Sequence, residues 1–124
     1  ELANVVSGAR EARRLLDEIA SPSLCIVLDP ANLFEVANAK ERCRVVDEAI
    51  DPSADSIGMA HAKDRTASGG FTPAGQGVID FAHFVERLKQ TGFSGSLVTH
   101  GLDASQAPHT ALFLENILSK ADCT

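Results

Sequence analysis

The chain has 124 residues, of which 44% are hydrophobic, and its 11 basic and 17 acidic side chains give a formal net charge of −6. This length is close to that of one domain, and the apolar fraction is large enough to fill a core, which excludes two complete domains and a disordered chain. A net negative charge repels a phosphate backbone, and no block of Lys or Arg offsets it, so nucleic acid is disfavoured as a partner.

The sequence also bears on the cellular setting. No run approaches the roughly 18 consecutive apolar residues of a membrane span, and no targeting peptide is visible after Glu1. Cys25, Cys43 and Cys123 are odd in number and lie in no C-x-x-C spacing, which suits a reducing compartment. We therefore expect a cytoplasmic protein, and because the chain does not begin with Met, we expect it to be part of something longer.

The first predicted elements are a helix and a strand. Apolar residues recur with helical spacing from Ser7 to Ala20, with Ser7 as the expected N-cap and Pro22 preventing continuation. A continuous apolar run from Leu24 to Leu28 ends at Asp29. Runs of this kind are typical of strands buried on both faces of a parallel sheet.

The middle of the chain continues the alternation. A helix is predicted from Ala39 to Ile50, where apolar residues form one stripe, and a weaker apolar run from Ser56 to His61 predicts a second strand. Within the polar, glycine-rich stretch from Lys63 to Gly77, a long loop is predicted from Asp64 to Gly77. Long ordered loops in compact domains are often functional.

The last elements follow the same order. An amphipathic helix is predicted from Phe81, with Gly92 as its C′ residue, and the run from Ser96 to His100 predicts a third strand. Asp103 and Gln106 have the spacing of a capping box that would begin a final helix. Three strands alternating with four helices predict an α/β fold of parallel β/α units.

Each predicted strand ends at a residue that can bind a metal ion. These residues are Asp29, His61 and His100. Because the carboxyl ends of parallel strands form the mouth of the site in α/β folds, we expect the three side chains to converge. One carboxylate and two imidazoles suit Mn²⁺, Co²⁺, Zn²⁺ or Fe²⁺. Each residue alone has a simpler interpretation, since Asp before Pro often caps a turn and single histidines often pack.

Further polar residues lie beside these candidate ligands. Asn32 follows Asp29, and Lys63, Asp64 and Arg65 follow His61. We predict that they bind the hydroxyls or a carboxylate of a polar substrate, with Arg65 offering a bidentate fork. The alternative is that the three charged residues are simply the solvated start of a loop.

Signals for other chemistries are weak. The glycines match neither a phosphate-binding loop nor a dinucleotide fingerprint. We expect Gly75 and Gly77 instead to shape a turn, through positive φ or where a side chain would clash. His83 and His109 fall on predicted helices, where surface roles are expected.

Four short segments, taken in order, carry a resemblance to a known family. They are LDPANLF at 28–34, HAKD at 61–64, GQGVIDF at 75–81 and TGFSGSL at 91–97. The sequence resembles the C-terminal part of the sugar phosphate isomerase/epimerase family, the xylose-isomerase-like (β/α)8 barrels, over nearly its whole length. The resemblance implies that residues 1–124 are the later portion of one TIM-barrel domain of about 250 residues, with the N-terminal half absent.

The resemblance also implies a metal site. Family members bind one divalent cation (here Mn²⁺, Co²⁺, Zn²⁺ or Mg²⁺) through a Glu, an Asp, a His and a second Glu. Asp29 matches the Asp and His61 the His, whereas His100 stands where the second Glu is expected. Asn32 falls where many relatives place a substrate-contacting His. The first Glu is expected upstream of Glu1.

The implied function is a metal-dependent isomerase or epimerase acting on a sugar, sugar phosphate or related polyol. It would transfer a proton next to a carbonyl, with His100 as metal ligand and as catalytic base. Dehydration of such a polyol is not separated from epimerisation, and a homo-oligomer is compatible with the sequence. Alternatives are a non-catalytic polyol-binding barrel and, disfavoured by only four histidines and the acidic charge, an abasic-site DNA endonuclease.

Overall fold

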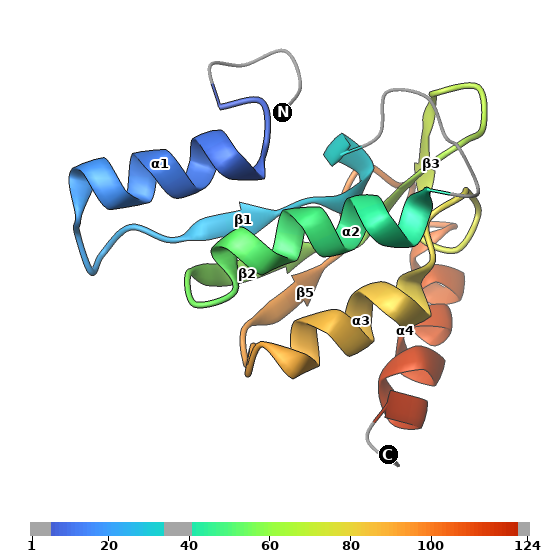
Figure 1. The fold of residues 1–124 in the computed structure, drawn as a ribbon. Coiled ribbons are helices and arrows are strands. Elements are labelled where there is room, and N and C mark those ends of the chain that lie inside the picture. The colour runs from blue at the N-terminus through green and yellow to red at the C-terminus, as the bar shows by residue number, and fades with distance from the viewer. Residues whose placement is uncertain (1–5, 34–40, 122–124) are drawn as a thin grey trace.

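The computed structural model describes residues 6–33 and 41–121 of the chain (Figure 1). Its helices and strands follow in the order α1 (Ala9–Ile19), β1 (Ile26–Leu28), α2 (Arg42–Ile50), β2 (Ile57–His61), β3 (Lys63–Arg65), β4 (Phe71–Pro73), α3 (Phe81–Gln90), β5 (Ser96–Val98) and α4 (Ala107–Ala121). Short 3-10 helices follow β1, as η1 (Pro30–Leu33), and α2, as η2 (Asp51–Ser53). Within this described part, the predicted alternation of four α-helices with three parallel strands is confirmed.

The three parallel strands form one sheet in the order β1-β2-β5. Its register places Leu28 beside Ala60 and Ala60 beside Leu97, so these residues share one face of the sheet. Leu28 and Ala60 are buried beneath the helices, and α2 and α3 cross this face in Figure 1. On the opposite face Val27 lies beside Met59, and these side chains are 50% and 36% exposed. In the described part of the chain, helices therefore cover one face of the sheet and leave the other open.

The core lies between the sheet and its helices. The predicted apolar positions of α3 are all buried, and Phe81 and Phe84 meet edge to face with their ring centroids 6.1 Å apart. They pack in the same cluster as Val46 and Ile50 of α2. Gly92 then takes a left-handed φ of 80°, as expected of a C′ residue that ends a helix. The amphipathic pattern thus holds α3 against α2 and fixes where the chain enters β5.

The stretch from Lys63 to Gly77 is not the single loop that the sequence predicts. It contains an antiparallel hairpin of β3 and β4, in which Asp64 pairs with Thr72 and Arg65 with Phe71. Charged residues form β3, so the apolar pattern on which the strand predictions depend is missing there. The prediction is therefore wrong for this segment, which projects as a structured arm beyond the end of β2 (Figure 1).

Of the predicted helix starts, one is wrong and another is confirmed in part. The helix α1 begins after Gly8, which has an extended backbone and makes no side-chain cap bond, so the predicted N-cap at Ser7 is wrong. At α4, the backbone N–H of Asp103 donates to Oε1 of Gln106 at 2.8 Å, which is one half of the predicted capping box. Ala39, the predicted start of the second helix, lies outside the described residues.

The two helical histidines have different surroundings. His109 is exposed, as predicted, but His83 is half-buried and its Nε2 lies 2.8 Å from Oδ1 of Asp47. The same oxygen accepts a hydrogen bond from the Nε–H of Arg87, with a nitrogen–oxygen distance of 2.7 Å. His83 is therefore part of a polar contact that joins α3 to α2, and not a simple surface residue.

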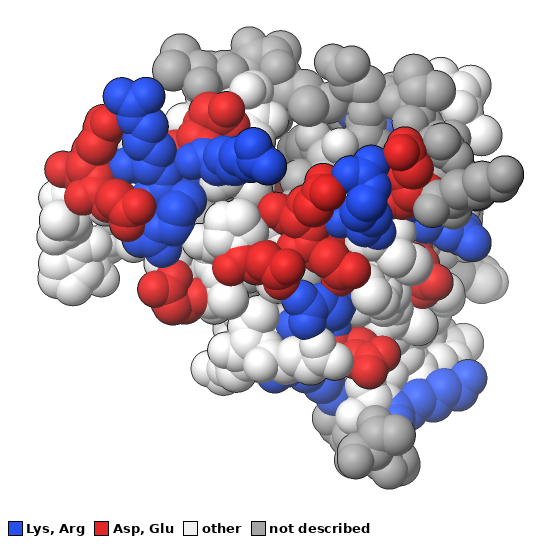
Figure 2. Space-filling model, in the orientation of Figure 1, with Lys and Arg blue, Asp and Glu red and all other residues white. Residues whose placement is uncertain are grey.

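Charges of both signs are mixed on the helical side of the molecule. Figure 2 shows Lys and Arg interleaved with Asp and Glu across α1 and α2. Ion pairs one helical turn apart account for part of this pattern, as between Arg13 and Asp17 at 2.5 Å and between Arg44 and Glu48 at 2.7 Å. This face offers no continuous basic surface for a nucleic acid backbone. Among residues 6–33 and 41–121, no helix combines the length and apolarity needed to cross a membrane.

Candidate metal centre

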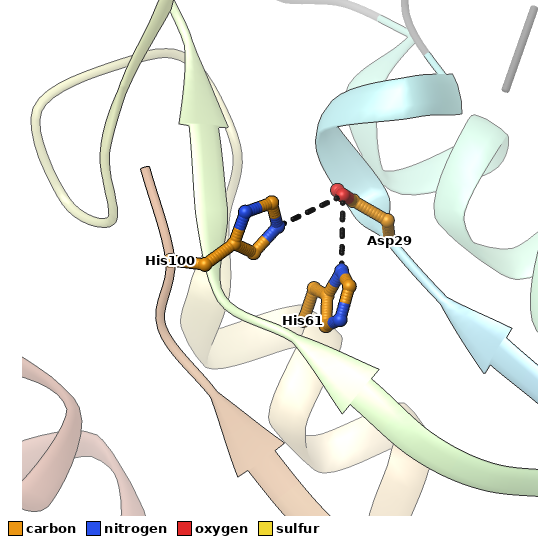
Figure 3. Close-up of side chains that lie close together, drawn as sticks. All are labelled: Asp29, His61 and His100. Carbon is orange, nitrogen blue, oxygen red and sulfur yellow. Dashed lines mark hydrogen bonds and ion pairs between the residues drawn. The ribbon is translucent and has the colours of Figure 1, made fainter. Parts of the chain in front are cut away.

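Asp29, His61 and His100 meet at the carboxyl end of the sheet (Figure 3). Asp29 directly follows β1, His61 is the last residue of β2, and His100 lies two residues beyond β5. The register explains the meeting, because Leu28 pairs with Ala60 and His61 pairs with Val98, so the three strands end at one edge of the sheet. One ligand atom from each side chain lies within 4.8 Å of the other two. The predicted convergence of these three side chains is therefore confirmed, while metal binding stays a prediction.

The two imidazoles approach a single carboxylate oxygen. Nδ1 of His61 is 3.3 Å and Nε2 of His100 is 3.6 Å from Oδ2 of Asp29. The rings meet edge to face with centroids 4.4 Å apart. Ligand atoms that share a tetrahedral Zn²⁺ at about 2.1 Å are about 3.4 Å from each other, so both separations suit a shared cation.

The other oxygen of the Asp29 carboxylate orients the group. Oδ1 accepts the backbone N–H of Ala31 at 3.0 Å, and the carbonyl oxygen of Asp29 accepts the N–H of Asn32 at 3.2 Å. The Asp29 side chain is only 8% exposed. The turn-capping role and the ligand role are therefore compatible, because the cap uses Oδ1 and leaves Oδ2 for the site.

Nε2 of His100 has no hydrogen-bond partner in the described part of the chain, although this atom is buried. Its 3.6 Å distance to Asp29 is too long for a hydrogen bond. A buried polar atom without a partner costs about 1–3 kcal/mol, which a bound cation would offset. The donor set fits a divalent ion that accepts nitrogen ligands, namely Zn²⁺, Co²⁺, Mn²⁺ or Fe²⁺, better than Mg²⁺, which prefers oxygen.

The predicted substrate residues lie in two places beside this centre. Asn32 is part of η1 and, with Asp29, lines one end of a groove of about 270 Å³ between α1 and β1. Lys63 and Arg65 lie on β3, where both side chains approach the ring of Phe71. Because β3 contacts η1, the two places adjoin each other.

Asp64 has a structural role that the sequence does not reveal. Oδ2 accepts the N–H groups of Gly75 and Gly77 at 3.1 and 2.9 Å, and Oδ1 accepts those of Arg65 and Ile79 at 2.8 and 3.0 Å. The residue is fully buried. All of its strong acceptor positions are used, so we leave Asp64 out of the substrate site proposed below.

Phe71 is the residue near the site that the sequence interpretation misses. This residue is 53% exposed, and Nζ of Lys63 lies 3.5 Å from the ring centroid. A lone aromatic residue within a polar, glycine-rich segment is the signal that could have identified it, since such a side chain has no local apolar partners.

A parallel sheet covered by helices on one face, with ligand-type side chains at its carboxyl ends, is the architecture of part of a TIM barrel. Residues 2–117 match the family of xylose isomerase-like TIM barrels, and the chain belongs to this family.

Two solved structures share the fold. One is a xylose isomerase domain protein from Planctomyces limnophilus, with a TM-score of 0.73 and 19% identity, covering 94% of this chain and 44% of that one. The other is a D-tagatose 3-epimerase-like protein, with a TM-score of 0.71 and 20% identity, covering 93% of this chain and 42% of that one. The chain thus spans less than half the length of either. No curated protein matches it.

Proposed function

We propose that the chain contributes to the active site of a divalent-metal-dependent isomerase or epimerase that acts on a sugar, sugar phosphate or related polyol. The observation that carries this proposal is the buried Nε2 of His100, which has no hydrogen-bond partner among the described residues and lies 3.6 Å from Oδ2 of Asp29, beside Nδ1 of His61. Membership in the xylose isomerase-like family supports it. As part of the same proposal, residues 1–124 form the later portion of a single barrel domain.

Asp29, His61 and His100 would hold one divalent cation. When bound, the cation polarises a substrate carbonyl and stabilises the negative charge that develops on its oxygen during proton transfer. The carboxylate of Asp29 is held for this task by the N–H of Ala31. The ring of His100 is the most accessible of the three side chains, at 40% exposed, so it is the one best placed to meet a substrate.

The two roles predicted for His100 exclude one another when Nε2 binds a cation. A neutral imidazole bound through one nitrogen carries its proton on the other. Nδ1 of His100 would then donate a hydrogen bond to a substrate oxygen and could not accept a proton. We therefore assign His100 as metal ligand and hydrogen-bond donor, and assign no catalytic base.

The remaining polar residues would hold the substrate. The backbone N–H of Asn32, in η1, donates to the carbonyl oxygen of Asp29, and the side-chain amide of Asn32 would bind a hydroxyl group. Lys63 and Arg65 lie on β3, which contacts η1. These three residues form the proposed substrate contacts.

Proton transfer next to a carbonyl can be tested directly. The full-length protein is incubated in D₂O with Mn²⁺, Co²⁺ or Zn²⁺ and a panel of ketoses, hydroxypyruvate and inosose-type compounds. NMR then reports deuterium at the carbon beside the carbonyl, and mass spectrometry reports epimers or dehydrated products. We expect incorporation with at least one substrate, and its loss in Asp29→Asn and after chelation. Binding of a substrate without incorporation or product would contradict the proposal.

One observation favours a second candidate, a non-catalytic polyol-binding barrel. His100 and Asn32 both depart from the residues that the family resemblance leads us to expect at these positions. Substrate binding that is unaffected by metal removal would support this candidate over the enzyme.

A further inference from the structure

The hairpin that follows His61 carries two positive charges on one face. Arg65 and Phe71 pair across β3 and β4, and Lys63 lies two residues before Arg65, so the three side chains share this face. Nζ of Lys63 is 3.5 Å and Cζ of Arg65 is 4.6 Å from the centroid of the Phe71 ring. An exposed aromatic ring therefore holds two cations close together.

Among the described residues, these charges have no acidic ion-pair partner. Within residues 6–33 and 41–121, neither Lys63 nor Arg65 takes part in an ion pair. The intervening carboxylate of Asp64 lies on the opposite face and already accepts four backbone N–H groups. Nε of Arg65 is buried and has no hydrogen-bond partner there. Because like charges repel and an unpartnered buried donor is costly, the cluster favours an anionic ligand.

We infer that Lys63, Arg65 and Phe71 form an anion-recognition site, and that the substrate of the proposed reaction is a small polyol bearing a phosphate or a carboxylate. The guanidinium of Arg65 offers a planar fork for either group, and the ammonium of Lys63 offers a point charge. Phe71 is a positioning residue that holds both cations at this face.

The location of the cluster agrees with a substrate-binding role. The strand β3 begins two residues after His61, and it contacts η1, which carries Asn32 beside Asp29. The cluster therefore lies on an element that directly follows one candidate ligand and contacts the segment after another. The assignment of the anion to a substrate rests on the proposed function, whereas anion binding itself does not.

Calorimetric titration of the full-length, metal-free protein tests this inference. The probes are glycerol, glycerate and glycerol 1-phosphate, which differ in the presence and kind of anionic group. We expect the anionic probes to bind and glycerol not to bind. The anionic probe that binds with the higher affinity then identifies whether the site prefers a carboxylate or a phosphate.

The variants Lys63→Gln and Arg65→Gln each remove one charge from the cluster. We expect each variant to bind the preferred anion with about tenfold lower affinity, as the loss of a charge-assisted hydrogen bond would cause. Arg65→Lys keeps the charge but loses the planar fork of the guanidinium. Its affinity for the anion should lie between that of Arg65→Gln and that of the unaltered protein. Lys120→Gln removes the same charge from the exposed end of α4 and should change the affinity less than twofold.

Three results would overturn the inference: no anion binding by the unaltered protein, equal binding of glycerol and the anions, or full affinity in both single-charge variants. Metal binding, measured separately, distinguishes this inference from the proposed function. If the protein binds the anion but no metal, the proposed function is contradicted and this inference is not. If it binds the metal but no anion, this inference is contradicted and the proposed function is not.

Discussion

Oδ2 of Asp64 accepts the backbone N–H of Gly77 at 2.9 Å, and this bond ties the hairpin to the segment that leads into α3. The same carboxylate also accepts the N–H groups of Arg65, Gly75 and Ile79. Because Asp64 is fully buried, no bulk water can replace a lost bond. The position of β3, and with it of the two hairpin cations, therefore depends on one side chain.

Asp64→Asn should destabilise the protein by about 3 kcal/mol. The amide keeps one acceptor oxygen but turns an NH₂ group toward two of the four N–H donors, which leaves them unsatisfied. Urea unfolding followed by circular dichroism measures the difference. Asp17→Asn, at an exposed carboxylate on α1, should change stability by less than about 1 kcal/mol. Equal stability of the Asp64→Asn variant and the unaltered protein would show that the four bonds do not hold the hairpin.

Gly77→Ala should be more damaging than Gly92→Ala. A Cβ atom at Gly77 would lie 2.3 Å from the carbonyl oxygen of Arg65 and 2.3 Å from Oδ1 of Asp64, so the loop has to move. A Cβ atom at Gly92 would meet no described residue within 4 Å apart from its chain neighbours, and the cost is only that of a left-handed φ, about 1 kcal/mol. We expect Gly77→Ala to cost at least about 2 kcal/mol in the same unfolding assay. A smaller loss at Gly77 than at Gly92 would contradict this close packing.

Asp47 should contribute a pH-dependent part of the stability. Burial acts to raise the pKa of Asp47, but hydrogen bonds from His83 and Arg87 outweigh it and hold this pKa below its ordinary value of 3.8. A carboxylate with a lowered folded-state pKa stabilises the fold above its unfolded pKa, and this contribution is lost as the pH falls through the folded pKa. Asp47→Asn should therefore be destabilising at neutral pH, by about 1 kcal/mol given partial exposure, and the difference should shrink below about pH 4.

Denaturation of both proteins at neutral and acidic pH measures this effect. Glu48→Gln, at the neighbouring and more exposed carboxylate, is the matched control and should cost less than about 0.5 kcal/mol. A difference between Asp47→Asn and the unaltered protein that persists unchanged at acidic pH would rule out ionisation of Asp47 as its source.

Much of the fold could be predicted from the sequence because it depends on apolar periodicity. The stripe that begins at Phe81 identifies α3, and the uninterrupted run before Asp29 identifies β1. Parallel strands then require their carboxyl ends to share one edge, which is why the meeting of Asp29, His61 and His100 could be predicted without coordinates.

The features that the sequence analysis missed depend on long-range polar contacts. Lys63, Asp64 and Arg65 give no apolar alternation, so the hairpin could not be distinguished from a loop. The carboxylate of Asp64 binds N–H groups that only the folded loop brings to it. His83 likewise finds Asp47 only after α3 packs on α2. Local patterns carry no information on such contacts.

Substitutions of His100 test whether it is a metal ligand. If His100 is a metal ligand, His100→Ala should lose the cation, whereas His100→Glu, which provides a carboxylate at the same place, should retain it. Metal content after dialysis, measured by mass spectrometry, distinguishes the variants. Equal retention by His100→Ala and the unaltered protein would show that His100 is not a ligand.

The most direct test of the central claim is calorimetric titration of the full-length protein with Zn²⁺ and Mn²⁺. Asp29→Asn is the decisive variant, because its amide oxygen can still accept the N–H of Ala31 while the charged ligand is lost. We predict one cation per chain for the unaltered protein and for Asp17→Asn, and an affinity at least about a hundredfold lower for Asp29→Asn. Equal and negligible metal binding by the unaltered protein and Asp29→Asn would contradict the account.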